Sequence, residues 1–283
     1  VTMHLQPTCF MSQYETPVLH QWFATINHWP ATFKRQILRA SGWVSDRALS
    51  PGANTLRQTL GLPPVRHIIR DWWHSPARVI GLFPDWYAPP QPDWPRNTTL
   101  TGFPLYDEQG ISTIEPDLKK FLSESTEPPI VFTPGSANTQ AAKFFTSAVD
   151  ACRQLNHRGL LLTRFPDQIP DSLPIGIHHS TYAPLSKILP HAAALVHHGG
   201  IGTAAQALRA ACPQLIMPMT FDQPDNADRL YRLGVGRLLS PSSFTGPRVA
   251  KELDTLLGSE NVSQACHTLA QRFVDCDPIG DTC

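Results

Sequence analysis

The 283-residue chain has no net charge, no long apolar run and no metal-type cysteine spacing. Its 23 Lys and Arg residues balance 23 Asp and Glu residues. This balance argues against a dedicated nucleic-acid binder and against electrostatic docking on an anionic membrane, because both need surplus positive charge. No stretch of about 18 apolar residues is present, so we expect no membrane-spanning helix. The start, residues 1–9, lacks the basic and then apolar pattern of a signal peptide.

The sequence also lacks the motifs of metal sites and of disulfide-bonded proteins. The sequence contains neither a CxxC pair nor an HExxH motif, whereas a zinc site needs three or four converging ligands. The scattered cysteines are Cys9, Cys152, Cys212, Cys266, Cys276 and Cys283. We therefore expect reduced thiols, no bound metal and a cytoplasmic protein.

Proline, in contrast, is abundant and indicates how the chain is divided. The 28 prolines in 283 residues are roughly double the usual 5%. Because proline fixes φ and removes an N–H donor, the dense stretch 84–95 predicts a linker or an ordered surface crossing instead of a helix or central strand. We divide the chain into an N-terminal part, residues 1–83, a Pro-rich linker, 84–126, and a C-terminal domain with its tail, 127–283.

The C-terminal part alternates short apolar segments with amphipathic ones. The expected strands are 130–133, 160–163, 175–179, 193–197 and 215–218, and the expected helices are 139–155, 185–189, 203–211, 225–233, 249–257 and 262–274. This alternation predicts βαβ units and a parallel α/β sheet that is covered on both faces. In the N-terminal part we expect helices at 19–40 and 53–60 and a strand at 79–83.

Three expected strands end in turns that carry unusual chemistry. The turns are 134–136, 197–203 and 220–226. Ligands bind beyond the carboxyl ends of strands in open α/β sheets, so we expect these turns to converge on one edge. In the second turn, Gly200 and Gly202 permit close backbone approach, and the following helix offers unpaired N–H groups to an anion. His198 and Thr203 can donate to phosphate oxygens. The structural alternative is a tight turn without a ligand.

The same region partly matches a dinucleotide fingerprint. Gly200-x-Gly202-x-x-Ala205 follows a strand, and Asp222 lies 20 residues after Gly202, where a ribose-binding acid is expected. Such a fingerprint usually opens a domain, whereas several strands precede this one, so NAD binding is the weaker hypothesis. Asp222 and Gln223 together accept and donate hydrogen bonds, which suits vicinal sugar hydroxyls. Capping of the next helix by Asp222 is the alternative.

Other polar residues fit ordinary structural roles. We interpret Arg209 and Arg229 as solvated helix residues, and Asp225 and Asp228 as charges that complement a helix start. The remaining histidines of this region are interpreted as surface or core residues, namely His178, His179 and His191.

The C-terminal motifs resemble the donor-binding signature of glycosyltransferase family 1. The similarity is carried by Tyr182-Ala183-Pro184-Leu185, by 196–203, by Asp222-Gln223-Pro224-Asp225-Asn226 and by Leu233-Gly234-Val235-Gly236. It is dense over residues 130–257 and strongest toward the bacterial, sterol- and antibiotic-glucosyltransferase branch.

This resemblance implies the GT-B architecture, in which two Rossmann-like domains face each other across a cleft. Residues 1–83 would then be part of the acceptor-side domain, and 127–283 the nucleotide-sugar-binding domain. By position in the motifs, His198, Gly200, Gly202 and Thr203 would contact the diphosphate. The other implied donor-binding residues are Ser136 for the phosphates, Tyr182 and Ala183 for the pyrimidine base, and Asp222 and Gln223 for the sugar. No cofactor or metal is implied, because the nucleotide-sugar is a substrate.

The N-terminal part departs from the family pattern. The family's glycine-rich strand–turn–helix carries the histidine that deprotonates the acceptor, and residues 1–60 contain nothing similar. His4, His20 and His28 lack that context. The chain therefore resembles an N-terminally truncated member, and we expect exposed apolar surface around its tryptophans and little transfer by the chain alone. That surface should involve Trp22, Trp29, Trp43, Trp72 and Trp73.

The functional hypothesis is an inverting transfer of a hexose from a UDP- or dTDP-sugar to a small-molecule or lipid acceptor. A non-catalytic nucleotide-sugar-binding remnant or partner subunit is the main alternative. An epimerase of the same architecture, acting on a nucleotide-sugar, is a third and weaker one.

Overall fold

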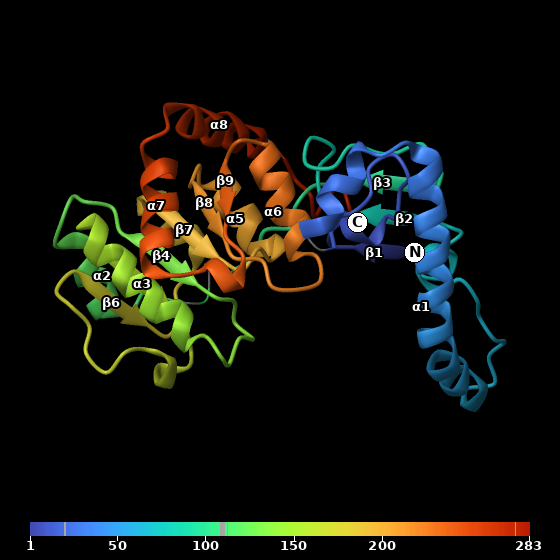
Figure 1. The fold of residues 1–283 in the computed structure, drawn as a ribbon, viewed down its shortest axis with the longest axis horizontal. Helices are drawn as coiled ribbons and strands as arrows, with labels where there is room; N and C mark the ends of the chain where they lie inside the picture. Colours follow the sequence, from blue (N-terminus) through green and yellow to red (C-terminus); the bar gives the residue numbers. More distant parts are fainter. Residues whose placement is uncertain (20, 108–110, 112, 275) are drawn as a thin grey trace. The chain divides into compact units, whose positions relative to one another are not determined.

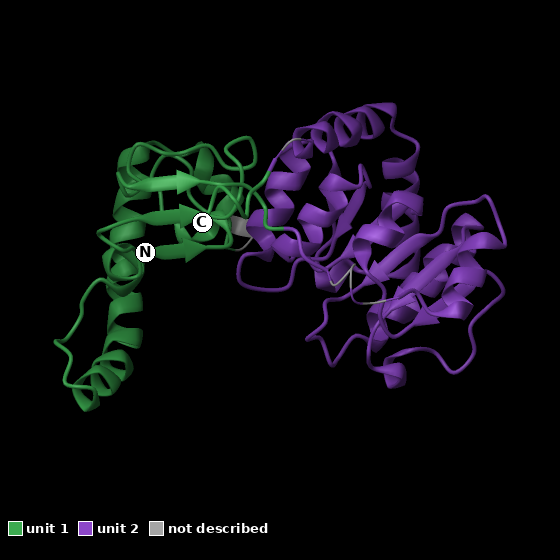
Figure 2. Ribbon diagram, turned by 180° about the vertical axis from the view of Figure 1, so that it is seen from behind, with its two compact units in different colours: residues 1–104, 277–283 green, residues 105–276 purple. Residues whose placement is uncertain are grey.

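The computed structural model describes residues 1–19, 21–107, 111, 113–274 and 276–283. It divides into two compact units, residues 1–104 with 277–283 and residues 105–276 (Figure 2). The division falls inside the expected linker, 84–126, and the tail returns to the first unit instead of completing the second. The physical reason is burial, because Tyr87 and Trp94 of the Pro-rich stretch belong to the core of the first unit.

The second unit is built on a six-stranded sheet in which every adjacent pair is parallel, in the order β6-β5-β4-β7-β8-β9 (Figure 1). The strands are β4 (Ile130–Thr133), β5 (Gly159–Leu162), β6 (Ile177–Ser180), β7 (Ala194–His197), β8 (Gln214–Ile216) and β9 (Gly236–Leu238). Thr133 of β4 lies opposite His197 of β7, so the turns that follow these two strands start side by side.

Helices cover both faces of this sheet. They are α2 (Pro116–Ser123), α3 (Ala142–Leu155), α4 (Leu185–Ile188), α5 (Ile201–Arg209), α6 (Gln223–Arg232), α7 (Gly246–Leu257) and α8 (Glu260–Ala270). Short 3-10 turns occur at Pro166–Gln168, Leu189–His191, Pro241–Ser243 and Gln271–Phe273. Successive residues of β4 enter different core clusters, since Phe132 packs with Phe145 of α3 and Val131 packs with Leu118 of α2. Side chains alternate along a strand, so both faces are buried and the predicted parallel α/β class is confirmed.

The first unit contains a smaller parallel sheet in the order β1-β2-β3. Its elements are β1 (Thr2–His4), the 3-10 turns Pro7–Cys9 and Gln21–His28, α1 (Ala31–Thr59), a π-helical turn Ile68–Trp72, β2 (Val79–Gly81) and β3 (Thr98–Leu100). The rings of Phe10 and Trp94 stack with centroids 4.5 Å apart, and Phe83 packs on both.

Helix α1 differs from the prediction of two separate helices. It runs without interruption for 29 residues and includes Pro51. Much of its apolar surface is exposed, with Trp43 68% and Phe33 63% exposed, and Trp29 and Trp72 are about half exposed as well. The expected exposed surface is therefore present, although Trp73 is more buried and the side chain of Trp22 lies outside the described residues, as does His20.

Two further findings concern the whole described chain. All six cysteines are free thiols. Among the helices described, none combines the length and apolarity that crossing a bilayer requires.

Candidate functional site

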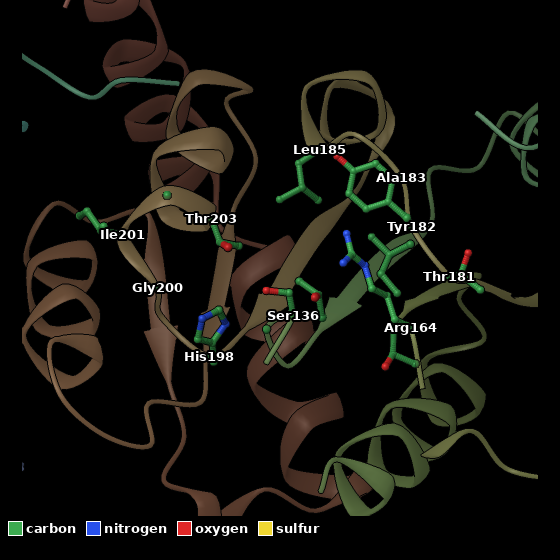
Figure 3. Close-up of a pocket in the computed structure, with 15 residues that line it drawn as sticks. Ser136, Arg164, Thr181, Tyr182, Ala183, Leu185, His198, Gly200, Ile201 and Thr203 are labelled. Atoms are coloured by element: carbon green, nitrogen blue, oxygen red, sulfur yellow. The ribbon is translucent and has the colours of Figure 1, made fainter. Parts of the chain in front are cut away.

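A cavity of about 360 Å³ opens at the carboxyl ends of β4, β5 and β7 in the second unit. Its lining residues come from the ends of these strands, from the segments that follow them and β6, and from the starts of α4 and α5 (Figure 3). They are Thr133, Gly135, Ser136, Leu162, Thr163, Arg164, Thr181, Tyr182, Ala183, Leu185, His198, Gly200, Ile201, Gly202 and Thr203. Its position is the one expected for a ligand site in a parallel α/β sheet.

Seven of the nine residues predicted to bind the donor line this cavity. They are Ser136, Tyr182, Ala183, His198, Gly200, Gly202 and Thr203. Asp222 and Gln223 do not line it, but their turn lies against the glycine turn. The Nδ2 atom of Asn226 donates to the carbonyl of Gly199 at 2.9 Å, and a Cβ on Gly199 would lie 3.1 Å from the carbonyl oxygen of Gln223. The three turns therefore converge on one edge of the sheet.

His197 fixes the glycine turn from beneath. The side chain is fully buried, and its Nδ1 accepts from the Gly199 N–H at 3.1 Å while its Nε2 donates to Oε1 of Gln214 at 3.0 Å. Burial lowers the pKa of His197 from 6.5 to about 3, so the ring is neutral. Of the two adjacent histidines, His197 thus orients the backbone and only His198 reaches the cavity.

His198 packs tightly between two glycines of different turns. A Cβ on Gly135 would lie 2.9 Å from its Cε1, and a Cβ on Gly200 would lie 2.6 Å from its Nε2. Neither position therefore tolerates a side chain without displacing the ring. Burial lowers the pKa of His198, which makes the imidazole a neutral hydrogen-bond donor at neutral pH. Its buried Nδ1 has no hydrogen-bond partner among the described residues.

The start of α5 adds backbone donors to the same wall of the cavity. Ile201, Gly202 and Thr203 form the first turn of this helix and line the cavity. Gly200 occupies the N-cap position, and no side chain caps the helix. The first N–H groups of a helix have no intrahelical acceptor and carry the positive end of its dipole. This wall is suited to an anionic group.

The opposite wall holds an anchored aromatic ring. The Tyr182 hydroxyl donates to the carbonyl of Asp107 at 2.8 Å, and the carboxylate of Asp107 accepts from the N–H of Ser186 at 2.6 Å. The guanidinium of Arg164 lies 5.6 Å from the centre of the Tyr182 ring. The ring is thereby held in place at the cavity, where its predicted contact with a base stays a prediction.

Arg164 is a lining residue that the sequence reasoning missed. It follows Leu162, the last residue of β5, by two positions. The rule that ligands bind beyond the carboxyl ends of parallel strands, which identified the other turns, therefore also applied to this one. Thr133, Thr163, Thr181 and the apolar residues Leu162, Leu185 and Ile201 were missed as well.

Asp222 and Gln223 organise their own turn in this structure. The Oδ2 atom of Asp222 accepts from Nδ2 of Asn226 at 2.8 Å, and Oε1 of Gln223 accepts from the N–H groups of Met219 and Thr220 at 2.9 and 3.2 Å. Asp222 sits at the N-cap position of α6, yet its side chain makes no capping hydrogen bond. Burial raises the pKa of Asp222. Capping by this side chain is thus not what the geometry shows, and sugar binding stays a prediction.

The prediction of a solvated Arg229 was wrong. Its side chain is 3% exposed and its Nε donates to Oδ2 of Asp225, itself 1% exposed, at 2.8 Å. Asp225 is therefore a buried partner and not simply a charge at the helix start. This face of α6 packs inward, and pairing one turn apart makes the two charges tolerable there. Arg209 is exposed, as predicted.

The other histidines of this unit fit the structural roles predicted for them. The ring of His178 stacks on Phe121 at 5.1 Å, and Nε2 of His179 lies 3.0 Å from the carbonyl oxygen of Thr163. His191 is exposed. No group of three or more His, Cys, Asp or Glu side chains able to hold a metal occurs in the part of the chain that the structure describes.

Comparison with known proteins identifies this part of the chain. Residues 163–278 match the family described as erythromycin biosynthesis protein CIII-like, C-terminal domain. This segment is therefore similar to that C-terminal domain, and the relatives named next are glycosyltransferases. The resemblance stated from the motifs is thereby confirmed.

Two characterised relatives illustrate the family. The chain is 36% identical over 192 residues to O-mycaminosyltylonolide 6-deoxyallosyltransferase of Streptomyces fradiae, covering 64% of this chain and 42% of that enzyme. It is 33% identical over 190 residues to vancomycin aglycone glucosyltransferase of Amycolatopsis orientalis, covering 65% and 43%. The chain spans about half the length of the curated relatives it matches, between 42% and 57%.

Solved structures support the fold class. The glycosyltransferase of kitacinnamycin has a TM-score of 0.70 at 20% identity, covering 84% of this chain and 62% of that one. The glycosyltransferase VinC, in complex with dTDP, has a TM-score of 0.58 at 21% identity, covering 72% and 51%. These likenesses confirm the predicted GT-B type of fold, with a Rossmann-like second unit.

Proposed function

We propose that the chain provides the donor half of an inverting glycosyltransferase, which transfers a hexose from a UDP- or dTDP-sugar to a small-molecule or lipid acceptor. The observation that carries this proposal is the cavity in which His198, the first turn of α5 and Ser136 converge. The names of the relatives agree, since they transfer deoxyallose or glucose, and VinC was solved with dTDP. Residues 1–104 would contribute to the acceptor side.

The cavity is suited to stabilising the leaving group. During transfer the acceptor oxygen bonds to the anomeric carbon while the bond from that carbon to the diphosphate oxygen breaks. The departing diphosphate then gains negative charge. Neutral His198, the α5 N–H groups and the hydroxyls of Ser136 and Thr203 are donors already placed before the reaction, which is the arrangement that lowers a barrier electrostatically.

The acceptor's proton needs a base from elsewhere in the active enzyme. None of the described residues that line the cavity carries a carboxylate, and His198 is assigned to the leaving group. His4 is 7% exposed and its Nε2 lies 3.1 Å from Nδ1 of His74, so it is a core residue of the first unit. The absence of a base among these described residues is the observation that favours the second candidate, a nucleotide-sugar-binding module without activity of its own.

Two measurements distinguish these functions. Calorimetry should show binding of UDP or dTDP in preference to NAD, because the cavity presents one anion-binding wall opposite an aromatic ring. Incubation with labelled nucleotide-sugars and a panel of lipid, sterol and phenolic acceptors should then give little product. Rapid product formation would overturn the binding-module candidate, and preferential NAD binding would overturn both.

A further inference from the structure

Arg164 brings a permanent positive charge into the cavity. Among the lining residues that the structure describes, it is the one Lys or Arg, and none is Asp or Glu. Figure 3 shows its guanidinium below the Tyr182 ring. The Arg164 side chain thus lines the cavity while it is also exposed to solvent.

Within the described part of the chain, the Arg164 guanidinium is not neutralised. No ion pair joins it to a carboxylate, and its recorded contact is with the face of Tyr182, 5.6 Å from the ring centre. An aromatic face orients a guanidinium but leaves its N–H groups able to bind an anion. The contact with Tyr182 thus orients the Arg164 guanidinium and leaves its charge available to bind an anion.

The remaining donors of the cavity carry no full charge. His198 is neutral at neutral pH because burial lowers its pKa. The start of α5 contributes roughly half an elementary charge, and Ser136 and Thr203 contribute hydroxyl dipoles. A ligand with two or three negative charges would therefore find most of its compensating charge on Arg164.

We propose that Arg164 makes this cavity selective for the phosphate charge of its nucleotide. This inference rests on the proposed function, and it assigns the guanidinium to the diphosphate oxygens on the side opposite α5. The planar fork of a guanidinium matches two phosphate oxygens at once. Contact with Tyr182 restricts the side chain in part, which reduces the conformational entropy that is lost when the anion binds.

The test compares three ligands of increasing charge, namely uridine, UMP and UDP. Their affinities are measured by calorimetry or NMR titration for the wild type, Arg164→Gln and Arg164→Lys. The matched control is Arg209→Gln, which removes the same charge from an exposed position at the end of α5. Thermal melts and circular dichroism establish that each variant is folded.

We expect Arg164→Gln to weaken UDP binding about ten- to a hundredfold, the usual loss for a hydrogen bond to a charged group. The affinity for UMP should fall by a smaller factor, and the affinity for uridine should change less than about twofold. Arg164→Lys should retain more UDP affinity than Arg164→Gln, and Arg209→Gln should behave like the wild type. Raising the salt concentration should weaken UDP binding more in the wild type than in Arg164→Gln.

Two results would overturn the inference while leaving the proposed function intact. One is unchanged UDP affinity in Arg164→Gln. The other is an equal loss of affinity for uridine and UDP, or an equal loss of UDP affinity in the Lys and Gln variants. In either case the shape of the Arg164 side chain, and not its charge, would account for the lost affinity. If the wild type binds neither UDP nor dTDP, the proposed function itself fails.

Discussion

Gly200 offers a direct steric test of the position of His198. A Cβ at residue 200 would lie 2.6 Å from Nε2 and 3.1 Å from Cε1 of that ring. Gly200 has φ −64° and ψ 138°, an extended conformation that alanine adopts without strain. Gly200→Ala therefore acts on the ring and not on the backbone. The ring must retreat by roughly 1 Å to reach an ordinary contact distance.

The displaced ring should lose its hydrogen bond to the ligand. Because His198 also packs on Gly135, little room remains for it to shift without leaving its place. Overpacking of this kind costs about 1–3 kcal/mol of stability. Loss of a hydrogen bond to a charged group costs about 1.5–3 kcal/mol. We expect UDP or dTDP affinity to fall about ten- to a hundredfold, as it should for His198→Ala.

A double-mutant cycle provides the assay. In the background of His198→Ala the new methyl group meets no ring, so Gly200→Ala should have little further effect on affinity. Gly202→Ala is the stability control, because a Cβ there meets nothing within 4 Å. Calorimetric titrations with UDP measure each corner of the cycle. Equal affinity of Gly200→Ala and wild type, or full additivity in the cycle, would refute this role for His198.

Three further predictions concern pH, the sugar and the buried ion pair. The folded pKa of His197 lies far below 6.5, so the unfolded chain binds the extra proton, and stability should fall as pH drops below about 6.5. Urea unfolding between pH 7 and 5 tests this, and a flat profile would contradict it. Asp222→Ala and Gln223→Ala should weaken binding of a nucleotide-sugar but not of UDP; equal weakening in calorimetry would assign both residues to turn structure alone. Asp225→Ala should destabilise the fold by about 3–5 kcal/mol, since it removes a carboxylate that pairs with the buried Arg229 guanidinium, and an unchanged melting temperature would contradict this.

The sequence predicted the helices and strands best where the hydrophobic pattern and the turn residues agree. Strand β4 has the expected bounds, 130–133, because an apolar run is closed on both sides by proline. The three-residue strands β1, β3 and β9 were missed, since their pairing depends on distant segments and not on local pattern. The predicted gap between two helices in the first unit was wrong, because α1 continues through Pro51.

The candidate site was predictable where a motif carried it. The glycine turn and Ser136 were found because each follows an apolar strand, and they do line one cavity. Arg164 has no motif, and only its place after β5 could have indicated it. Burial of Arg229 could not be read from α6, whose polar sequence resembles a solvated helix while the fold turns one charged pair inward. The contact of Asp222 with Asn226 likewise follows from the fold of the turn and not from the motif, and sugar binding by Asp222 stays a prediction.

The central claim is that the cavity between the β4 and β7 turns binds the diphosphate of a pyrimidine nucleotide. A crystal structure of the chain with UDP or dTDP tests it most directly. We predict that the diphosphate lies at the start of α5, within hydrogen-bond distance of His198 and the N–H groups of Gly202 and Thr203. A nucleotide bound elsewhere, or one whose phosphates point away from α5, would contradict the account.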